Sequence, residues 1–178
     1  MKILSPAKVN LRLEVLGIRA DKYHNIFSII QPISLYDEVF LEVGKGSDGI
    51  CVDCNHPQVP SNRDNLAYRA AEAFVQRTGF KGKIEIEIKK KIPVAAGLGG
   101  GSSNAAIVLK GLNDMVGEKL TFEDLQVMGR KLGADVPFFL LGKNSLATGI
   151  GEILEEIELP KFWYVIINPG FPLATREV

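Results

Sequence analysis

Alternating apolar and polar residues mark several short segments as strands that bury one face. Residues 84–89 alternate isoleucine with charged residues, and residues 39–43 keep the same two-residue period. Residues 9–15 alternate as well, after an interruption at residues 5–7 that predicts either two short strands or one bent strand. Residues 50–52 follow a glycine-rich turn, so we expect them to pair with residues 39–43 as a hairpin.

Apolar residues at helical spacing predict three helices. The first has its apolar face at residues 66–74, follows capping-box spacing at residues 61–64 and ends near Gly79. The second has its face at residues 105–116. The third follows capping-box spacing at residues 121–124 and stops at Gly133.

Three later segments, residues 145–148, 153–159 and 162–167, read as further strands, with Trp163 in the core. Because strands alternate with helices and hairpins are frequent, we predict an α+β fold in which helices cover one face of a sheet. A chain of 178 residues with 46% hydrophobic residues is long and apolar enough for one domain with a full core.

Net charge argues against two classes of partner. The chain has 21 basic and 21 acidic residues, which leaves no electrostatic footprint for nucleic acid or an anionic membrane. It has no apolar run long enough to span a membrane and no signal-peptide pattern at the N-terminus. We therefore expect a cytoplasmic protein that binds neither nucleic acid nor membrane.

Cys51 and Cys54 form a C-x-x-C pattern with His56 close by, which could be half of a zinc site or a redox pair. The chain has no second cysteine pair. We therefore predict structural or incidental thiols and no metal site.

Residues 93–104 concentrate more backbone freedom than any other stretch, since four of the twelve are glycine. They run directly into the second predicted helix, whose N-terminal N–H groups and dipole favour an anion. We expect Ser102 and Ser103 to cap this helix and to offer hydroxyls to a polyphosphate or its metal. The stretch matches neither the P-loop nor the dinucleotide-binding glycine pattern. The alternative is a flexible loop before an ordinary helix.

Two charged residues are ambiguous on spacing alone. Lys8 lies beside the predicted strand break, where a solvated edge charge is the simpler interpretation. Asp135 follows the stop at Gly133 and could simply cap a following helix that has proline in its first turn. Residues 89–91 are all lysine and end just before the glycine-rich stretch, where they could raise the local concentration of a polyphosphate.

The glycine-rich stretch resembles the phosphate loop of the GHMP small-molecule kinases, with eight positions in register: Pro93, Gly97, Leu98, Gly99, Ser102, Ser103, Ala105 and Ala106. Residues 5–11 are similar to the first motif of that family, and residues 133–138 to its segment with the catalytic acid. The Tyr23-His24 turn resembles the corresponding turn of family members that act on a cytidyl-diphosphate sugar alcohol. Lys22 and Ile30 depart from the glycine and aromatic residue usual there.

This resemblance implies an ATP-dependent kinase, using Mg²⁺, in the synthesis of isoprenoid (terpenoid) precursors. It implies that Lys8 supports the acceptor and the γ-phosphate and that Asp135 is the general base. Asn10, Tyr23 and His24 would position the substrate. The nucleotide would be held by the loop, with Asn65 and Lys91 as further candidates; the loop residues are Pro93, Val94, Ala95, Ala96, Gly97, Leu98, Gly99, Gly100, Gly101, Ser102 and Ser103.

For the fold, the resemblance implies a ribosomal S5 domain 2-like domain at residues 1–160. Residues 161–178 would form its last strand and the start of a linker into a ferredoxin-like C-terminal domain that this chain lacks. We therefore expect this chain alone to be inactive and to self-associate.

Two alternatives remain open. One is another GHMP kinase with a mevalonate-like or amino-alcohol substrate, against which the Tyr23-His24 turn argues. The other is a nonenzymatic nucleotide- or RNA-binding module of S5-like fold. Neutral charge and the presence of both Lys8 and Asp135 weigh against it.

Overall fold

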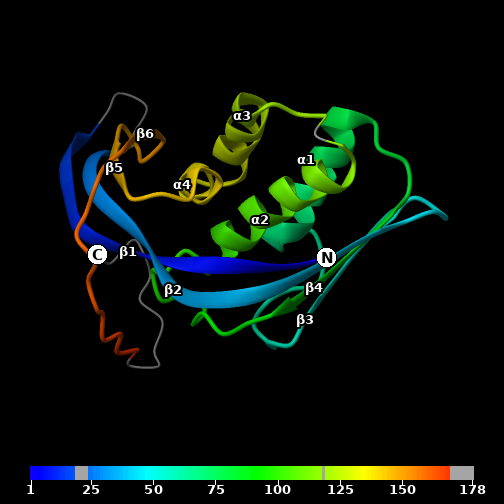
Figure 1. Cartoon of the computed structure of the whole chain (residues 1–178), viewed down its shortest axis with the longest axis horizontal. Helices are drawn as coiled ribbons and strands as arrows, with labels where there is room; N and C mark the ends of the chain where they lie inside the picture. The colour runs from blue at the N-terminus through cyan, green and yellow to red at the C-terminus, as the bar shows by residue number, and fades with distance from the viewer. Residues whose placement is uncertain (19–23, 118, 169–178) are drawn as a thin grey trace.

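The computed structural model describes residues 1–18, 24–117 and 119–168, and shows in them a mixed sheet covered by helices on one face (Figure 1). The sheet runs in the order β3-β4-β2-β5-β6, with β1 paired to β2. The elements in chain order are β1 (Lys2–Ile18), β2 (His24–Gly44), β3 (Gly49–Cys54), α1 (Leu66–Thr78), β4 (Lys83–Lys89), α2 (Gly100–Met115), α3 (Phe122–Leu132), α4 (Val136–Leu141), β5 (Ser145–Thr148) and β6 (Ile153–Glu156). The predicted α+β fold is confirmed.

β1 is one bent strand, the second of the two predicted alternatives. It pairs antiparallel with β2 along its whole length, and its register shifts between Pro6 and Ala7, between Asn10 and Arg12, and again near Gly17. Such bulges bend a strand and increase its twist. Figure 1 shows the paired ribbon running beneath α2 and then curling up beside β5 and β6. The first bulge falls just before Lys8, so it sets the direction of the chain at that residue.

The predicted hairpin between residues 39–43 and 50–52 is wrong. β3 pairs in parallel with β4, and β4 pairs antiparallel with β2, so β4 lies between them. A parallel pair needs a crossover connection, which α1 supplies between β3 and β4. The central place of β4 fits its side chains, because Ile84, Ile86 and Ile88 are buried.

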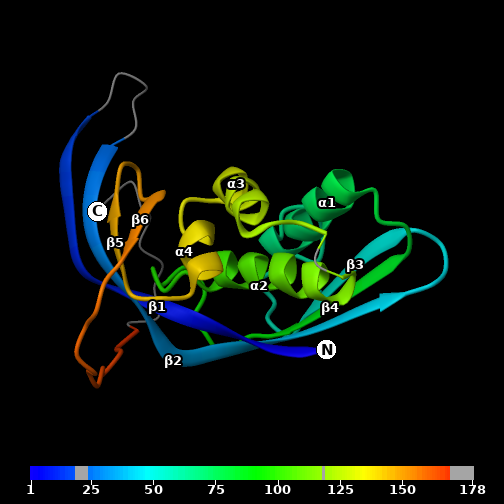
Figure 2. The same cartoon turned by 45° about the horizontal axis from the view of Figure 1, so that its top comes forward.

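The four helices lie on one side of the sheet, as predicted (Figure 2). α2 crosses β1 and β2 closely at Gly111, where a Cβ would lie 2.7 Å from the Ile3 side chain and 2.9 Å from that of Leu41. Apolar side chains from α1, α2 and the sheet, including Phe74 and Leu109, are fully buried between the layers. This packing fixes the N-terminus of α2 over β1. Of the helices described, none has the length and apolar character that crossing a membrane requires.

Three of the predicted helix boundaries agree with the structure. α1 ends at the left-handed C-cap Gly79, and α3 begins with the capping box of Thr121 and Asp124 and ends at Gly133. The start of α1 differs, because Asn65 and not Ser61 caps it. An asparagine side chain can accept from the N–H two residues ahead, which makes it as good a cap as serine.

The expected last strand is absent from the described residues. β6 ends at Glu156, residues 157–168 form no strand, and Trp163 is fully exposed, so its assignment to the core is wrong. An apolar run alone did not suffice at residues 162–167, because in the described part of the chain no strand pairs with them. Of the expected segment 161–178, residues 169–178 lie outside the described residues.

Cys51 and Cys54 lie on β3 with a spacing of three, which places them on opposite faces of a strand. Cys51 is exposed, whereas burial raises the pKa of the Cys54 thiol. Within the described ranges no group of three or more metal-binding side chains comes together.

Candidate active site

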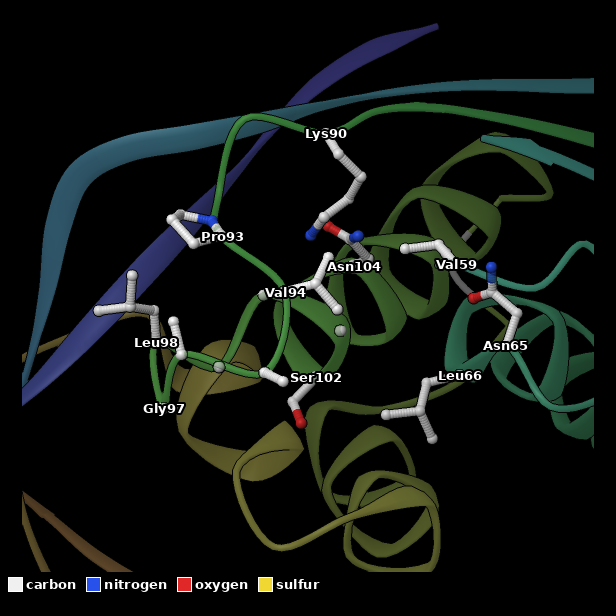
Figure 3. A pocket seen from close by; sticks show the side chains of 15 residues that line it. Val59, Asn65, Leu66, Lys90, Pro93, Val94, Gly97, Leu98, Ser102 and Asn104 are labelled. Atoms are coloured by element: carbon white, nitrogen blue, oxygen red, sulfur yellow. The ribbon is translucent and has the colours of Figure 1, made fainter. Parts of the chain in front are cut away.

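The glycine-rich stretch forms a pocket of about 340 Å³ between β4 and the start of α2 (Figure 3). Gly97 and Gly99 both have φ of 71°, a conformation that favours glycine. Gly99 is the N-cap of α2, and no side chain caps this helix. The first N–H groups of α2 are therefore available to an anion. The loop is held to β1, because the Lys8 N–H donates to the Leu98 carbonyl at 3.0 Å.

The prediction that Ser102 and Ser103 cap α2 is wrong, because the helix begins before both, at Gly100. Ser103 is fully buried and faces β1, where Ser5 Oγ lies 2.8 Å from both Ser103 Oγ and Asn104 Oδ1. Ser102 is half-buried and lines the pocket. A Cβ at Gly133 would lie 3.8 Å from Ser102 Oγ, so Ser102 approaches the segment before Asp135.

Lys8 and Asp135 meet beside the loop. Lys8 is only 7% exposed, and its Nζ lies 2.8 Å from Asn10 Oδ1 and 3.8 Å from Asp135 Oδ2. Lys8 is thus not a solvated edge charge. Asp135 occupies the N-cap position of α4, yet its side chain makes no capping hydrogen bond and is 40% exposed. Its carboxylate therefore faces Lys8 and keeps an accessible side.

Contacts at Gly99 join the loop to this pair. A Cβ there would lie 3.1 Å from Lys8 Cγ and 2.8 Å from the Phe139 ring of α4. Lys8, the N-cap of α2 and the helix after Asp135 are therefore in direct contact. The fold brings a lysine ammonium, a carboxylate and an uncapped helix N-terminus to one place.

The two weaker nucleotide candidates differ in position. Asn65 lines the pocket but its amide group is engaged, since Oδ1 accepts from the Ala67 N–H at 2.9 Å and Nδ2 donates to the Pro60 carbonyl at 2.8 Å. Lys91 does not line the loop pocket, and its Nζ lies 2.7 Å from Glu38 Oε1. Of the three consecutive lysines, Lys90 lines the pocket.

Sequence reasoning missed Lys90, although a signal was present. In β4 the buried positions are 84, 86 and 88. The same two-residue period predicts that residue 90 also faces the interior. Lys90 pairs with Asp37 of β2, a residue far away in the sequence. Val59, Leu66 and Asn104 also line the pocket and carried no sequence signal of that role.

The three substrate candidates are not gathered at one point. Asn10 contacts Lys8, as described above. His24 is exposed at the start of β2, opposite Ile18, whereas Lys8 is opposite Pro32. Eight residues of strand separate His24 from Pro32, which corresponds to at most about 26 Å. Tyr23 lies outside the described residues.

Comparisons with known proteins find similarity to kinases. Residues 65–143 match the family model for the GHMP kinases N terminal domain. The 4-diphosphocytidyl-2-C-methyl-D-erythritol kinase of Syntrophotalea carbinolica is 50% identical over 98% of this chain and 62% of its own length. That of Alkaliphilus metalliredigens is also 50% identical, over the whole chain and 61% of its own length. The chain thus spans about three fifths of the length of the curated relatives it matches.

Solved structures agree with this result. A crystal structure of 4-(cytidine 5'-diphospho)-2C-methyl-D-erythritol kinase matches with a TM-score of 0.77 and 44% identity, over 90% of this chain and 56% of that one. A homoserine kinase from Cytophaga hutchinsonii has a TM-score of 0.63 and 22% identity, over 89% of this chain and 51% of that one, which shows the shared fold alone.

Proposed function

Since this chain belongs to the GHMP kinase family through the domain at residues 65–143, we propose that it is part of an ATP-dependent kinase acting on 4-diphosphocytidyl-2-C-methyl-D-erythritol. The reaction would phosphorylate the 2-hydroxyl, in the cytoplasm, in non-mevalonate synthesis of isoprenoid precursors. The observation that carries the proposal is the 3.8 Å approach of Lys8 and Asp135 beside an uncapped, glycine-rich helix N-terminus.

The nucleotide would lie in the loop pocket, with its phosphates toward the first N–H groups of α2. Mg²⁺ usually keeps several waters and binds through one or two carboxylates together with phosphate oxygens. The Ser102 hydroxyl fits that need as one ligand, because it lines the loop pocket and its segment lies close to that of Asp135. When bound with ATP, the ion neutralises charge on the phosphates.

Asp135 would accept the proton of the substrate hydroxyl. The oxygen of that hydroxyl then bonds to the γ-phosphorus while the bond between the γ-phosphorus and ADP breaks. The Lys8 ammonium would stabilise negative charge on the transferred group. Asn10 orients that ammonium, since its amide oxygen accepts from Lys8 Nζ. These roles require the acceptor hydroxyl to lie between Asp135 and the end of the triphosphate.

The positions of the substrate candidates fit an elongated acceptor. Asn10 lies at the reacting end, whereas His24 lies further along the β1–β2 pair, opposite Ile18. A cytidyl diphosphate group bound at Lys8 could extend along this pair, with the cytosine toward His24.

The test is Asp135→Asn, which keeps the shape of the side chain but cannot accept the proton. In a protein that joins this chain to the remaining part of its relatives' length, we expect turnover to fall by several orders of magnitude while ATP affinity, measured by calorimetry, changes little. Asp114→Asn, an exposed aspartate of α2, is the matched control and should leave both unchanged. Turnover is followed as ADP release with the cytidyl substrate, mevalonate and homoserine as acceptors. Retention of more than about a tenth of wild-type turnover, a loss of only about 1.4 kcal/mol, would rule out the general-base role.

A further inference from the structure

A buried ion pair lies at the base of the glycine-rich loop and has no part in the mechanism above. Asp37 of β2 is fully buried, and the Lys90 side chain after β4 is 5% exposed. Lys90 Nζ donates to Asp37 Oδ2, while Asp37 Oδ1 accepts from the N–H groups of Lys91 at 2.8 Å and Ile92 at 2.9 Å. One carboxylate therefore fixes the backbone immediately before the loop begins.

The other side of Lys90 faces the pocket. A Cβ at Gly100 would lie 2.8 Å from Lys90 Nζ, so the ammonium lies against the first residue of α2. Figure 3 shows the Lys90 side chain reaching from the end of β4 toward Asn104, one turn into that helix. The ammonium thus adds its charge to a helix N-terminus that already favours anions.

Positive groups outnumber negative ones at the base of the loop. The ammonium and the helix N-terminus are both positive, and the Asp37 carboxylate already accepts from two backbone N–H groups as well as from Lys90. Exposed lysines in the same run are paired elsewhere, Lys89 with Glu87 and Lys91 with Glu38. Lys90 is therefore the lysine of this run whose charge acts on the loop pocket.

We propose that the Asp37–Lys90 pair positions the nucleotide: Asp37 sets the backbone of the loop and holds the Lys90 ammonium where it attracts the polyphosphate. This inference rests on the proposed function, because it assumes that the loop pocket binds ATP. Lys90 acts on the phosphates, and Asp37 acts through Lys90 and the loop backbone.

Three variants separate the charge from the structural support: Lys90→Met, Asp37→Asn and the double variant with both changes. Removing one partner leaves the other buried charge unpaired, whereas the double variant leaves neither charge and keeps an amide oxygen for the N–H groups of Lys91 and Ile92. We therefore expect the double variant to regain most of the melting temperature that each single variant loses. Lys89→Met, which removes an exposed neighbouring lysine, is the matched control.

Affinity for ATP and for adenosine is measured by calorimetry on each variant, together with KM for ATP and kcat. We expect Lys90→Met and the double variant to bind ATP at least tenfold more weakly and adenosine within twofold of wild type. The KM for ATP should rise while kcat at saturating ATP changes less than threefold. Lys89→Met should match the wild type throughout.

The inference is overturned if the double variant binds ATP as tightly as the wild type, because the pair then only supports the fold. An equal loss for adenosine and ATP overturns it as well, since Lys90 would then not act on the phosphates. If the wild-type protein binds no ATP, the proposed function itself fails and this inference with it.

Discussion

Gly99 is the residue at which most parts of the candidate site touch. Its φ of 71° disfavours residues with a Cβ, and it caps α2 without a side chain. Phe139 and Lys8 leave no room for a side chain at this position. Backbone conformation and packing therefore both require glycine here.

We predict that Gly99→Val abolishes measurable ATP binding. A β-branched side chain resists positive φ and would push Phe139 and Lys8 away from the loop. Gly79→Asn is the control, because Gly79 at the end of α1 has a similar φ of 67°, open space around a Cβ and no place in the loop, and asparagine tolerates this conformation. Calorimetry should show near wild-type ATP affinity for the control. Unchanged affinity in a folded Gly99→Val protein would place the nucleotide elsewhere.

Single residues differ in how far the sequence could predict them. Lys8, Asp135 and the glycines lie in motifs, so a resemblance found them, and the structure brings Lys8 and Asp135 together. Lys90 and Asp37 form a pair 53 residues apart, which no local sequence pattern predicts. Ser103 belongs to the motif, yet its side chain contacts Ser5. The residue at which α2 begins determines which face of the helix Ser103 occupies.

Glu38 links β1, β2 and the segment just after β4 near the loop. It lies on β2, forms an ion pair at 2.9 Å with Lys2 of β1, and accepts from Lys91 Nζ, just beyond β4. Hydrogen bonds from Lys91 and Lys2 lower the pKa of its carboxyl from 4.5 to about 2. The ionised form is therefore favoured by folding.

We predict that Glu38→Gln lowers the free energy of unfolding at pH 7 but not at pH 2. A carboxyl whose pKa is lowered in the folded state stabilises it above about pH 4.5, and that contribution is lost as the pH falls toward 2. Urea unfolding of both proteins at pH 7, 4 and 2 measures the difference. A difference that stays constant across this range would contradict the assignment.

The sequence predicted individual strands and helices better than it predicted which strands lie side by side. The two-residue period showed which face of β4 is buried, but such a period carries no information on which strand lies beside it. The order β3-β4-β2 depends on the crossover through α1, which a local hairpin pattern cannot reveal. Residues 162–167 are a continuous apolar run typical of a strand, but a strand also needs a partner for its backbone.

At the scale of the whole molecule, apolar residues are exposed at one end of the sheet. Leu13, Val15 and Ile18 of β1 are exposed, as are Val165 and Ile167. β1 also has a free edge, since in the described part of the chain it pairs with β2 alone. Exposed apolar surface and an unpaired edge both promote association.

We predict that the 178-residue chain self-associates, and that replacing Leu13 and Val15 with threonine reduces this. Threonine keeps the β propensity of the strand while removing apolar surface. Val127→Thr, an isolated exposed position on α3, should have no effect. Sedimentation velocity over a range of concentrations measures the outcome, and a monomer at all concentrations would contradict it. That this chain alone is inactive also stays a prediction, which ADP release tests.

β2 is hydrogen-bonded on both edges in two places, to β1 and β4 at residues 38–40 and to β1 and β5 at residues 28–30. Each amide hydrogen there points to one neighbouring strand and can exchange with solvent deuterium only when that strand separates from β2. Apart from the Lys8 N–H, which donates to Leu98, the amides of β1 that point to its free edge need no such opening. Exchange should therefore be fast along the outside of β1 and slow in β2, so that the strand paired with Lys8 stays closed after the free edge beside it has exchanged.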